Sequence, residues 1–415
     1  MEKITAYEAA LEELHSVAKV LNLSDEIVAM LETPQRLMAV TIPVRMDDGS
    51  MCYYKGYRAQ HNAALGPTRG GTRFHKDETE DDVKALAFWM TIKNSLAGIP
   101  SGGAKGGVAV DPSTLSPTEL ERLCRGYIRS IYPMINPDVD VFGPDVGTPP
   151  QIMAWFLDEY ETISQKHAFT AFSGKPPLIG GSLGRNKATG YGLVACANEF
   201  LRLQKDNLAG KRVAIQGFGN LGSFAAEAFA ARGAKIVGIT DIGGGIQNKN
   251  GIDLAAAMQQ LKNTGSVAGL AGCDPIDNEG LLAMECDILV PAALQNQITE
   301  NNADKVRATY VVEGANGPTT PAGERVLLSK GIFMVPDILA NFGGVLVSYF
   351  EQVQNRYCFA WEEEEVISRL EKNMVQACNG VYGVAQEKKL SMRTSAWVLS
   401  LDKVIQAMRF RGWVR

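Results

Sequence analysis

Residues 212–232 read RVAIQGFGNLGSFAAEAFAAR: a short apolar run, three spaced glycines and an alanine-rich segment. The apolar run predicts a buried strand and the segment from 220 to 232 predicts a helix, so Gly217, Gly219 and Gly222 occupy the turn between them. Such a turn lets the backbone approach a pyrophosphate, and the positive end of the helix then faces the phosphate charge. This context predicts a dinucleotide site rather than an ordinary glycine turn.

The next strand, expected over residues 235–240, ends at Asp241. A carboxylate at this point bonds the adenosine ribose hydroxyls of a dinucleotide and repels a 2′-phosphate. Residues 242–248 contain no arginine or lysine to offset that repulsion. The pattern favours NAD as the cofactor and leaves NADP open, because acids near this position also occur in proteins that use NADP.

Further helices and strands alternate around this motif. The expected helices are near 188–204 and 252–262, and the expected strands are 287–292 and 310–315. Alternation with apolar strands predicts a parallel sheet covered by helices on both faces. The segments 341–385 and 392 onward are expected to be mostly helical.

The first half of the chain follows a different pattern. We expect helix within 1–33, two strands within 37–58, a glycine-rich passage at 66–74, a helix at 79–97, a loop followed by a strand within 101–112, a helix at 117–132, a strand running into a loop within 138–148, and a helix at 150–164. With 415 residues the chain is too long for one hydrophobic core, and the Gly-, Pro- and Ser-rich stretch 173–190 is the expected boundary. The fold class is therefore α/β, with an N-terminal α/β domain (1–185) and a Rossmann-type dinucleotide-binding domain (186–385).

Composition excludes several functional classes. The net charge is −5 and the sequence pI about 5.6, so nothing indicates an electrostatic nucleic-acid surface. Seven cysteines without a CxxC pair and only four histidines make neither a disulfide framework nor a metal site credible. The N-terminus lacks the apolar core of a signal peptide, and no stretch approaches the roughly 20 apolar residues that cross a bilayer. We expect a cytoplasmic protein that binds neither nucleic acid nor membrane.

Three side chains are candidates for chemistry. Lys105 lies in GGAKGG (102–107), where four glycines let other groups approach the amine and remove its water; the alternative is a solvated lysine in a flexible turn. Lys93 shares an apolar stripe of helix 79–97 with Leu86, Trp89 and Met90. It either binds an anionic ligand or extends its amine to solvent. Asp145, in GPDVGT (143–148), either acts on a proton or only bonds its own backbone.

Together these segments resemble the glutamate dehydrogenase family, which includes the leucine, valine and phenylalanine dehydrogenases. The resemblance is carried by GYRAQHNAALGPTRGGTRFH (56–75), ALAFWMTIKNSLAGIPSGGAKGGVAVDP (85–112), GPDVGT (143–148), GKPPLIGGSLGRNKATGYG (174–192), VAIQGFGNLG (213–222), VVEGANGPTTP (311–321) and DILANFGGVLVSYFEQVQN (337–355). These stretches span the chain in the family's order.

The resemblance implies a substrate domain followed by the dinucleotide domain, with substrate and nicotinamide meeting between them. It also implies that the C-terminal helix, 386–415, packs back on the first domain. The implied reaction is the reversible oxidative deamination of L-glutamate to 2-oxoglutarate and ammonia, in a homo-hexamer. A dehydrogenase for another L-amino acid, or a regulatory subunit that assembles with an active homologue, are the alternatives.

By position, the resemblance assigns roles to individual residues. Lys105 resembles the catalytic lysine and Asp145 its proton-transferring partner. Substrate binding falls to Lys93 for the α-carboxylate, to Arg69 and Ser348 for the distal carboxylate, and to Met90. The nicotinamide side falls to Thr189, Asn220, Asn316 and Asn341.

Two positions depart from the family pattern. Arg69-Gly70-Gly71 stands where the glutamate enzymes usually have KGG; arginine keeps the positive charge but is bulkier and planar. NFGG (341–344) stands where NAGG is usual, so Phe342 adds volume near the expected ligands. These two residues bear on the choice between the alternatives above.

Overall fold

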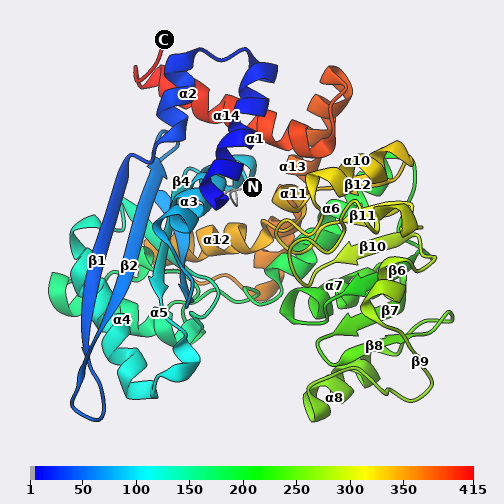
Figure 1. Ribbon diagram of the computed structural model, residues 1–415, viewed down its shortest axis with the longest axis horizontal. Helices are drawn as coiled ribbons and strands as arrows, with labels where there is room; N and C mark the ends of the chain where they lie inside the picture. Colours follow the sequence, from blue (N-terminus) through cyan, green and yellow to red (C-terminus); the bar gives the residue numbers. More distant parts are fainter. Residues whose placement is uncertain (1–4) are drawn as a thin grey trace. The chain divides into compact units, whose positions relative to one another are not determined.

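The computed structural model describes residues 5–415, and it divides the chain into two compact units (Figure 1). The first unit contains the chain up to Arg185 together with Val345–Val366 and Trp397–Arg415. The second contains Asn186–Gly344 and Ile367–Ala396. Each unit combines helices with a β-sheet, so the chain has the predicted α/β class. The part of the expected N-terminal helix that covers residues 1–4 lies outside the described residues.

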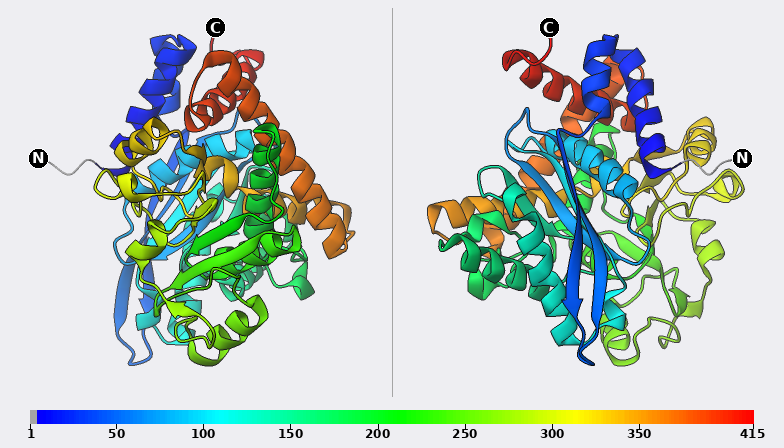
Figure 2. Two further views of the ribbon diagram at one scale, coloured as in Figure 1. Left: turned by 90° about the vertical axis from the view of Figure 1, so that its right-hand side faces the viewer. Right: turned by 60° about the vertical axis from the view of Figure 1, so that its left-hand side comes forward.

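The first unit is built on a five-stranded sheet of order β1-β2-β4-β3-β5. The strands β1, β2 and β4 are antiparallel neighbours, whereas β3 is parallel to both β4 and β5. The hairpin of β1 and β2 extends past the other strands, since the first residues of β2 pair with β1 alone (Figure 2). The bounds are β1 Arg36–Arg45, β2 Met51–Asn62, β3 Thr68–His75, β4 Gly102–Ala109 and β5 Asp140–Pro144.

Helices cover both faces of this sheet. The helix α3 packs on one face, where Ala87 lies in a small buried cluster with Ala59 and Val83. The helices α4 and α5 pack on the other, in the main core of this unit with Ile42 and Val108. The bounds are α1 Ala6–Leu21, α2 Asp25–Glu32, α3 Glu80–Leu96, α4 Pro117–Ile131, α5 Pro150–Ser164, α12 Gly343–Tyr357 and α14 Met392–Phe410.

Two glycine-rich passages form strands where irregular chain was expected. Residues 66–74 were predicted only as a glycine-rich passage, but most of them lie in β3. Residues 101–112 were predicted to begin with a loop, but β4 starts at Gly102. A Cβ on Gly70 would lie 1.5 Å from the Ala104 carbonyl oxygen, and one on Gly102 would lie 1.9 Å from the Asn62 carbonyl oxygen. These glycines therefore serve close backbone packing inside the sheet rather than turns.

The second unit is built on a seven-stranded sheet of order β12-β11-β10-β6-β7-β8-β9. Its five strands from β12 to β7 are parallel, and four of them, all but β12, were predicted. The antiparallel strands β8 and β9 were not predicted either. The tight connection after Asp241 allows β8 to turn back directly onto β7 instead of crossing over through a helix. The bounds are α6 Ala188–Leu203, β6 Arg212–Gln216, α7 Asn220–Ala231, β7 Lys235–Asp241, β8 Gly244–Gln247, α8 Leu254–Thr264, β9 Asp274–Pro275, α9 Asn278–Leu282, β10 Ile288–Pro291, β11 Tyr310–Val312, α10 Pro321–Ser329, β12 Phe333–Val335, α11 Asp337–Ala340 and α13 Glu363–Lys388.

The two units differ from the predicted domain ranges in the C-terminal part of the chain. Residues 345–366, expected in the dinucleotide domain, belong to the first unit because buried side chains of α12 bond residues there, as the Glu351–Lys175 ion pair illustrates. Of the segment 386–415, only Trp397–Arg415 belongs to the first unit. The part before it belongs to the second, where Arg393 forms ion pairs with Glu313 and Asp337.

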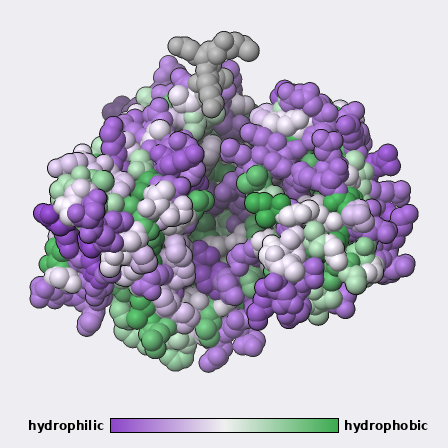
Figure 3. All heavy atoms as spheres, turned by 60° about the horizontal axis from the view of Figure 1, so that its bottom comes forward, coloured by the Kyte–Doolittle hydropathy of each residue, from purple (hydrophilic) through white to green (hydrophobic). Residues whose placement is uncertain are grey.

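Among residues 5–415, no helix combines the length and the apolar composition needed to span a bilayer. The face drawn in Figure 3 is largely hydrophilic, with small apolar patches scattered over it.

Candidate active site

Lys105 lies near the middle of β4, on the face of the sheet that α3 covers. Side chains alternate along a strand, so Gly103, Lys105 and Gly107 share this face. A Cβ on Gly103 would lie 2.2 Å from the backbone nitrogen of Thr91 in α3. The glycine frame therefore lets α3 lie close against the strand, and Lys105 is only 4% exposed. The alternative of a solvated lysine in a flexible turn does not hold.

Asp145 follows the end of β5 and contacts Lys105 directly. The Lys105 Nζ donates to Asp145 Oδ2 at 2.5 Å, and the Arg73 Nε donates to Oδ1 at 2.9 Å. The Asp145 Oδ1 also accepts from the Val146 backbone at 2.8 Å, so the local turn bond and the lysine contact coexist. Burial alone would raise the pKa of Asp145, but Lys105 and Arg73 outweigh it and hold this pKa well below its ordinary value.

Two charged residues next to this pair were missed by the sequence analysis. Arg73 lies on β3 opposite Gly107, and Glu78 precedes α3 with 5% exposure. Burial raises the pKa of Glu78 from its ordinary value of 4.5 to about 7, although Arg73 and Lys105 act in the opposite direction. Period-two alternation from Arg69 would have placed Arg73 on the same face, but only if 68–75 had been recognised as a strand.

Arg69 lies on β3 at the register position of Gly103 and is 2% exposed. Its Nη1 donates to Ser348 Oγ at 2.8 Å, and its Nη2 donates to the Gln352 side chain. Ser348 is further bonded to Ser173, with 2.6 Å between the hydroxyl oxygens. Burial lowers the pKa of Arg69 to about 10, with Glu351 acting in the opposite direction. The guanidinium is thus a buried cation whose two hydrogen-bond partners are neutral.

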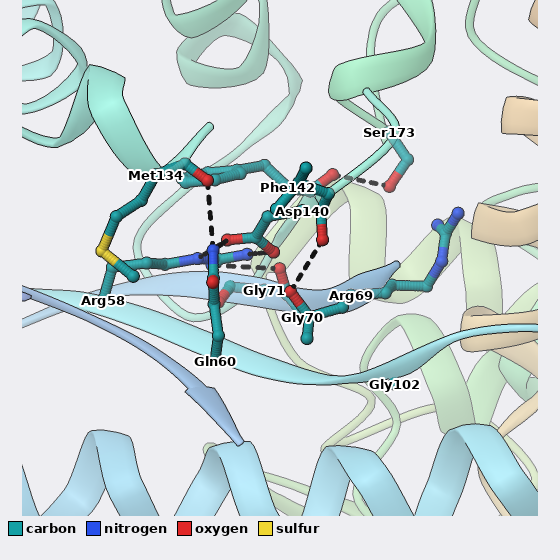
Figure 4. Close-up of polar contacts among 12 residues, drawn as sticks. Arg58, Gln60, Arg69, Gly70, Gly71, Gly102, Met134, Asp140, Phe142 and Ser173 are labelled. Carbon is teal, nitrogen blue, oxygen red and sulfur yellow. Dashed lines mark hydrogen bonds and ion pairs between the residues drawn. The ribbon is translucent and has the colours of Figure 1, made fainter. Parts of the chain in front are cut away.

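A second buried arginine holds the strands that carry this site. Arg58 forms a bidentate ion pair with Asp140, at 2.6 and 2.8 Å, and both side chains are fully buried (Figure 4). Gln60 donates to the same carboxylate at 3.0 Å. In Figure 4 the Arg69 side chain points away from this cluster, toward the Ser173 side. The Arg58 cluster therefore fixes β2 against β5. Arg69 is not part of this cluster and bonds Ser348 and Gln352 instead.

Lys93 and Met90 lie in the last two turns of α3, and both are half-buried. The stripe that Lys93 shares with Leu86 and Trp89 is not the buried side of the helix, since Trp89 is 37% exposed. The buried face instead carries small side chains such as Thr91, because β4 approaches it closely. The apolar stripe therefore lies on the more accessible side of α3, where both Lys93 and Met90 are half-buried.

The second unit carries the glycine turn between β6 and α7. Gly217 has φ +92°, a conformation that favours glycine, and a Cβ on Gly222 would lie 1.9 Å from the Gly217 carbonyl oxygen. Gly219 caps α7 without a side-chain hydrogen bond to the first turn, and a Cβ placed on it would meet open space. The turn thus offers free backbone donors beside an open space, which fits the pyrophosphate of a dinucleotide.

The residues expected near the nicotinamide lie in two places in this unit. Thr189 and Asn220 occupy the first turns of the neighbouring helices α6 and α7, and Asn220 donates to the Asn186 carbonyl oxygen at 3.0 Å. Asn341 donates to the Asn316 side chain at 2.9 Å and also bonds the Gly314 carbonyl oxygen at 3.2 Å. Asn316 and Asn341 are therefore in direct contact, whereas Thr189 and Asn220 lie on neighbouring helices.

Asp241 ends β7 as predicted, but most of its carboxylate is already bonded. Its Oδ1 accepts from Ser266 Oγ at 2.7 Å and from Gly243 N at 2.8 Å, and its Oδ2 accepts from Val267 N at 2.6 Å. A carboxylate has about four acceptor positions, so about one stays open for a ribose hydroxyl.

Phe342 is fully buried within the second unit, so its ring fills the interior there. Within the described part of the chain, no three His, Cys, Asp or Glu side chains are grouped as a metal site would require. The seven cysteines are free thiols.

A glycine turn on a mostly parallel sheet, with a buried lysine paired to a carboxylate on a separate α/β unit, defines a dinucleotide-dependent dehydrogenase. Residues 180–412 match the family model described as glutamate/leucine/phenylalanine/valine dehydrogenase, and residues 34–162 match the dimerisation domain of the same family. The chain belongs to the glutamate/leucine/phenylalanine/valine dehydrogenase family.

Individual relatives are similar along almost the whole chain. The cryptic catabolic NAD-specific glutamate dehydrogenase of Bacillus subtilis is 46% identical over 97% of this chain and 94% of its own. The crystal structure of glutamate dehydrogenase from Peptoniphilus asaccharolyticus is 39% identical with a TM-score of 0.90, over 99% of this chain and 100% of that one. The hetero-hexameric glutamate dehydrogenase of Thermus thermophilus, solved in a leucine-bound form, is 36% identical with a TM-score of 0.92, over 98% and 97%.

Proposed function

We propose that this protein catalyses the reversible oxidative deamination of L-glutamate to 2-oxoglutarate and ammonia with NAD as the cofactor. The single observation that carries the choice of an acidic substrate is Arg69, a buried cation bonded to the neutral side chains of Ser348 and Gln352. A buried charge requires an anionic partner, and the distal carboxylate of glutamate supplies one. The names of the relatives, NAD-specific glutamate dehydrogenases, support the same substrate and cofactor.

In this proposal the first unit binds and orients the substrate. Lys93 holds the α-carboxylate, with Met90 beside it on the same helix, while Arg69 and Ser348 hold the distal carboxylate. Two fixed carboxylates at opposite ends leave the substrate Cα little freedom, which lowers the entropic part of the barrier.

The second unit binds the dinucleotide. Gly217, Gly219 and Gly222 receive the pyrophosphate, and Asp241 takes a ribose hydroxyl with its remaining acceptor position. Thr189, Asn220, Asn316 and Asn341 are the residues proposed on the nicotinamide side. When bound, the nicotinamide ring supplies the acceptor for the hydride that leaves the substrate Cα.

Lys105 and Asp145 carry the proton transfers. Loss of the hydride leaves an iminium group, and the neutral amine of Lys105 removes a proton from the water that attacks it. Asp145 then moves protons to and from the nitrogen as the carbinolamine collapses to oxo acid and ammonium. The low pKa of Asp145 depends on the charge of Lys105, so the carboxylate becomes a better proton acceptor when that lysine is neutral.

The experiment is an assay of the purified protein alone for amino-acid-dependent reduction of NAD, with glutamate and a panel of aliphatic, aromatic and other acidic amino acids. We expect glutamate to be preferred. Preference for an apolar amino acid would identify a dehydrogenase of another specificity, and inactivity alone but activity with a homologue would identify a regulatory subunit.

Substitution of Arg69→Leu tests the substrate assignment. Loss of charge-assisted hydrogen bonds of about 1.5–3 kcal/mol lowers kcat/KM for glutamate by about 10- to 150-fold and favours apolar amino acids. The matched control is Arg36→Leu, because Arg36 is an exposed arginine on β1 of the same unit. An unchanged preference in the Arg69 variant would remove Arg69 from the side-chain pocket.

We further propose a cytoplasmic homo-hexamer. The Thermus thermophilus relative is named as a hetero-hexamer, which supports a six-subunit assembly and keeps a mixed one open. Light scattering of the purified protein distinguishes a hexamer of one chain from a smaller species that needs a second subunit.

A further inference from the structure

Four neighbouring positions lie on the face of the first sheet that carries Lys105. They are Gly71 and Arg73 on β3, and Lys105 and Gly107 on β4. The register pairs Arg69 with Gly103 and Arg73 with Gly107, which places Gly71 beside Lys105. A Cβ on Gly71 would lie 3.0 Å from Asp145 Cβ, and a Cβ on Gly107 would lie 2.6 Å from Glu78 Cγ and Oε1. Two cations on neighbouring strands thus alternate with two glycines, and each glycine has a carboxyl group seated over it.

The two carboxyl groups, of Asp145 and Glu78, differ in their hydrogen-bond partners. Asp145 bonds both Lys105 and Arg73. Glu78 is 5% exposed, and its Oε1 is buried without a hydrogen-bond partner. A buried carboxyl oxygen without a partner is costly, so a group retained in that state beside a reactive pair is a candidate for function.

We propose that Glu78 is a positioning residue for the reaction: its buried carboxyl group, seated over Gly107, controls by its charge how readily Lys105 gives up a proton. This proposal rests on the proposed role of Lys105. A carboxylate here favours the ammonium form of Lys105, and protonation of Glu78 removes that influence. Glu78 touches neither substrate nor dinucleotide in this scheme and acts through its neighbour.

The groups that face Glu78 come from every element packed around it. They are Arg73 of β3, Lys105 of β4, Asp145 after β5 and Asp82 of α3. The two cations favour the carboxylate and the two acids oppose it, while burial raises the pKa of Glu78 to about 7. Glu78 therefore changes charge within the range in which a dehydrogenase of this kind is assayed.

The test is the pH profile of kcat/KM for glutamate oxidation in wild type and Glu78→Gln. Glutamine keeps the shape and removes the charge, so neutral Lys105 forms more easily and the acidic limb moves to lower pH by about one unit. Activity on the high-pH plateau stays near wild type. The matched control is Glu80→Gln, which leaves the acidic limb unchanged, because Glu80 is a half-buried glutamate at the start of α3 that pairs with Lys84.

A second variant, Gly107→Ala, retains Glu78 but displaces its carboxyl group, and we expect the limb to move in the same direction. Profiles that coincide with wild type, or a uniform loss of activity at every pH, overturn the proposal. Inactivity of the wild-type protein refutes the proposed function instead.

Stability then supplies a readout that needs no activity. In the folded protein the pKa of Glu78 is raised from 4.5 to about 7. The stabilisation given by protonated Glu78 is therefore complete below about pH 4.5, and it is lost as the pH rises through about 7. Between about pH 4.5 and 7, the free energy of unfolding of the wild type therefore falls relative to that of Glu78→Gln. If the two proteins show the same dependence of unfolding free energy on pH, Glu78 does not have the raised pKa.

Discussion

Gly71→Ala is the change that separates Lys105 from Asp145 without altering either side chain. The added Cβ would lie 2.7 Å from the Pro144 carbonyl oxygen, 3.0 Å from Asp145 Cβ and 3.2 Å from Asp145 Oδ2. Ordinary carbon contacts need about 3.5 Å or more, so the segment carrying Asp145 has to move by roughly 0.5–1 Å. The Lys105–Asp145 contact of 2.5 Å then lengthens beyond a good hydrogen bond.

A displacement of this size next to the chemistry lowers kcat/KM for glutamate oxidation by about 100-fold. Overpacking costs about 1–3 kcal/mol of unfolding free energy, which a two-unit protein of this size tolerates. The assay is steady-state NAD reduction, combined with NADH fluorescence titration, which we expect to be unchanged because the glycine turn lies in the other unit.

Gly383→Ala is the matched control, because a Cβ at that position in α13 meets nothing within 4 Å. We expect it to leave activity unchanged and to raise stability by about 0.5–1 kcal/mol. Full activity in Gly71→Ala would refute the claim that the closeness of Lys105 and Asp145 matters.

Two further predictions concern the dinucleotide site and the interior of the first unit. In Gly222→Ala, the added Cβ would lie 1.9 Å from the Gly217 carbonyl oxygen and distort the glycine turn. We expect the Kd for NADH, measured by fluorescence titration, to rise by at least about tenfold. An affinity equal to wild type would exclude this turn from the cofactor site. In Lys175→Met, the fully buried Glu351 loses its ion-pair partner at 2.6 Å; the free energy of unfolding in urea falls by about 3–5 kcal/mol, and a stability equal to wild type would show that the pair is dispensable.

The parts of the fold that follow a strong local pattern were predictable. The sequence RVAIQGFGNLG combines an apolar strand, a glycine turn and a helix start within a few residues, and β6, Gly217 and α7 lie as expected. The predicted family is confirmed by the matches to both of its models. Periodicity also indicated α3, α4 and α5 with nearly their observed bounds.

The prediction of loops was wrong where glycines serve close backbone packing inside a strand. The glycines of 66–74 and 101–107 look like loop signals, yet they lie in β3 and β4 because neighbouring backbone approaches them too closely for a Cβ. Arg73 and Glu78 were missed for the same reason, since the face they share with Lys105 exists only once both segments are strands. Domain membership of 345–366 depends on contacts between residues distant in sequence, such as Arg69 with Ser348, which local patterns do not contain.

The roles of Lys105 and Asp145 remain predictions that the geometry makes specific. The two side chains are in contact, with Lys105 buried and Asp145 half-buried, as the proposed proton transfers require.

The most direct test is chemical rescue of Lys105→Ala. We expect glutamate oxidation to fall by at least about a thousandfold while NADH binding and thermal stability stay close to wild type. Small primary amines fit the space left by the lysine side chain and should restore turnover in proportion to the concentration of their neutral form. Appreciable activity in the unrescued variant, or a variant that has lost NADH binding together with activity, would contradict a proton-transferring amine at this position.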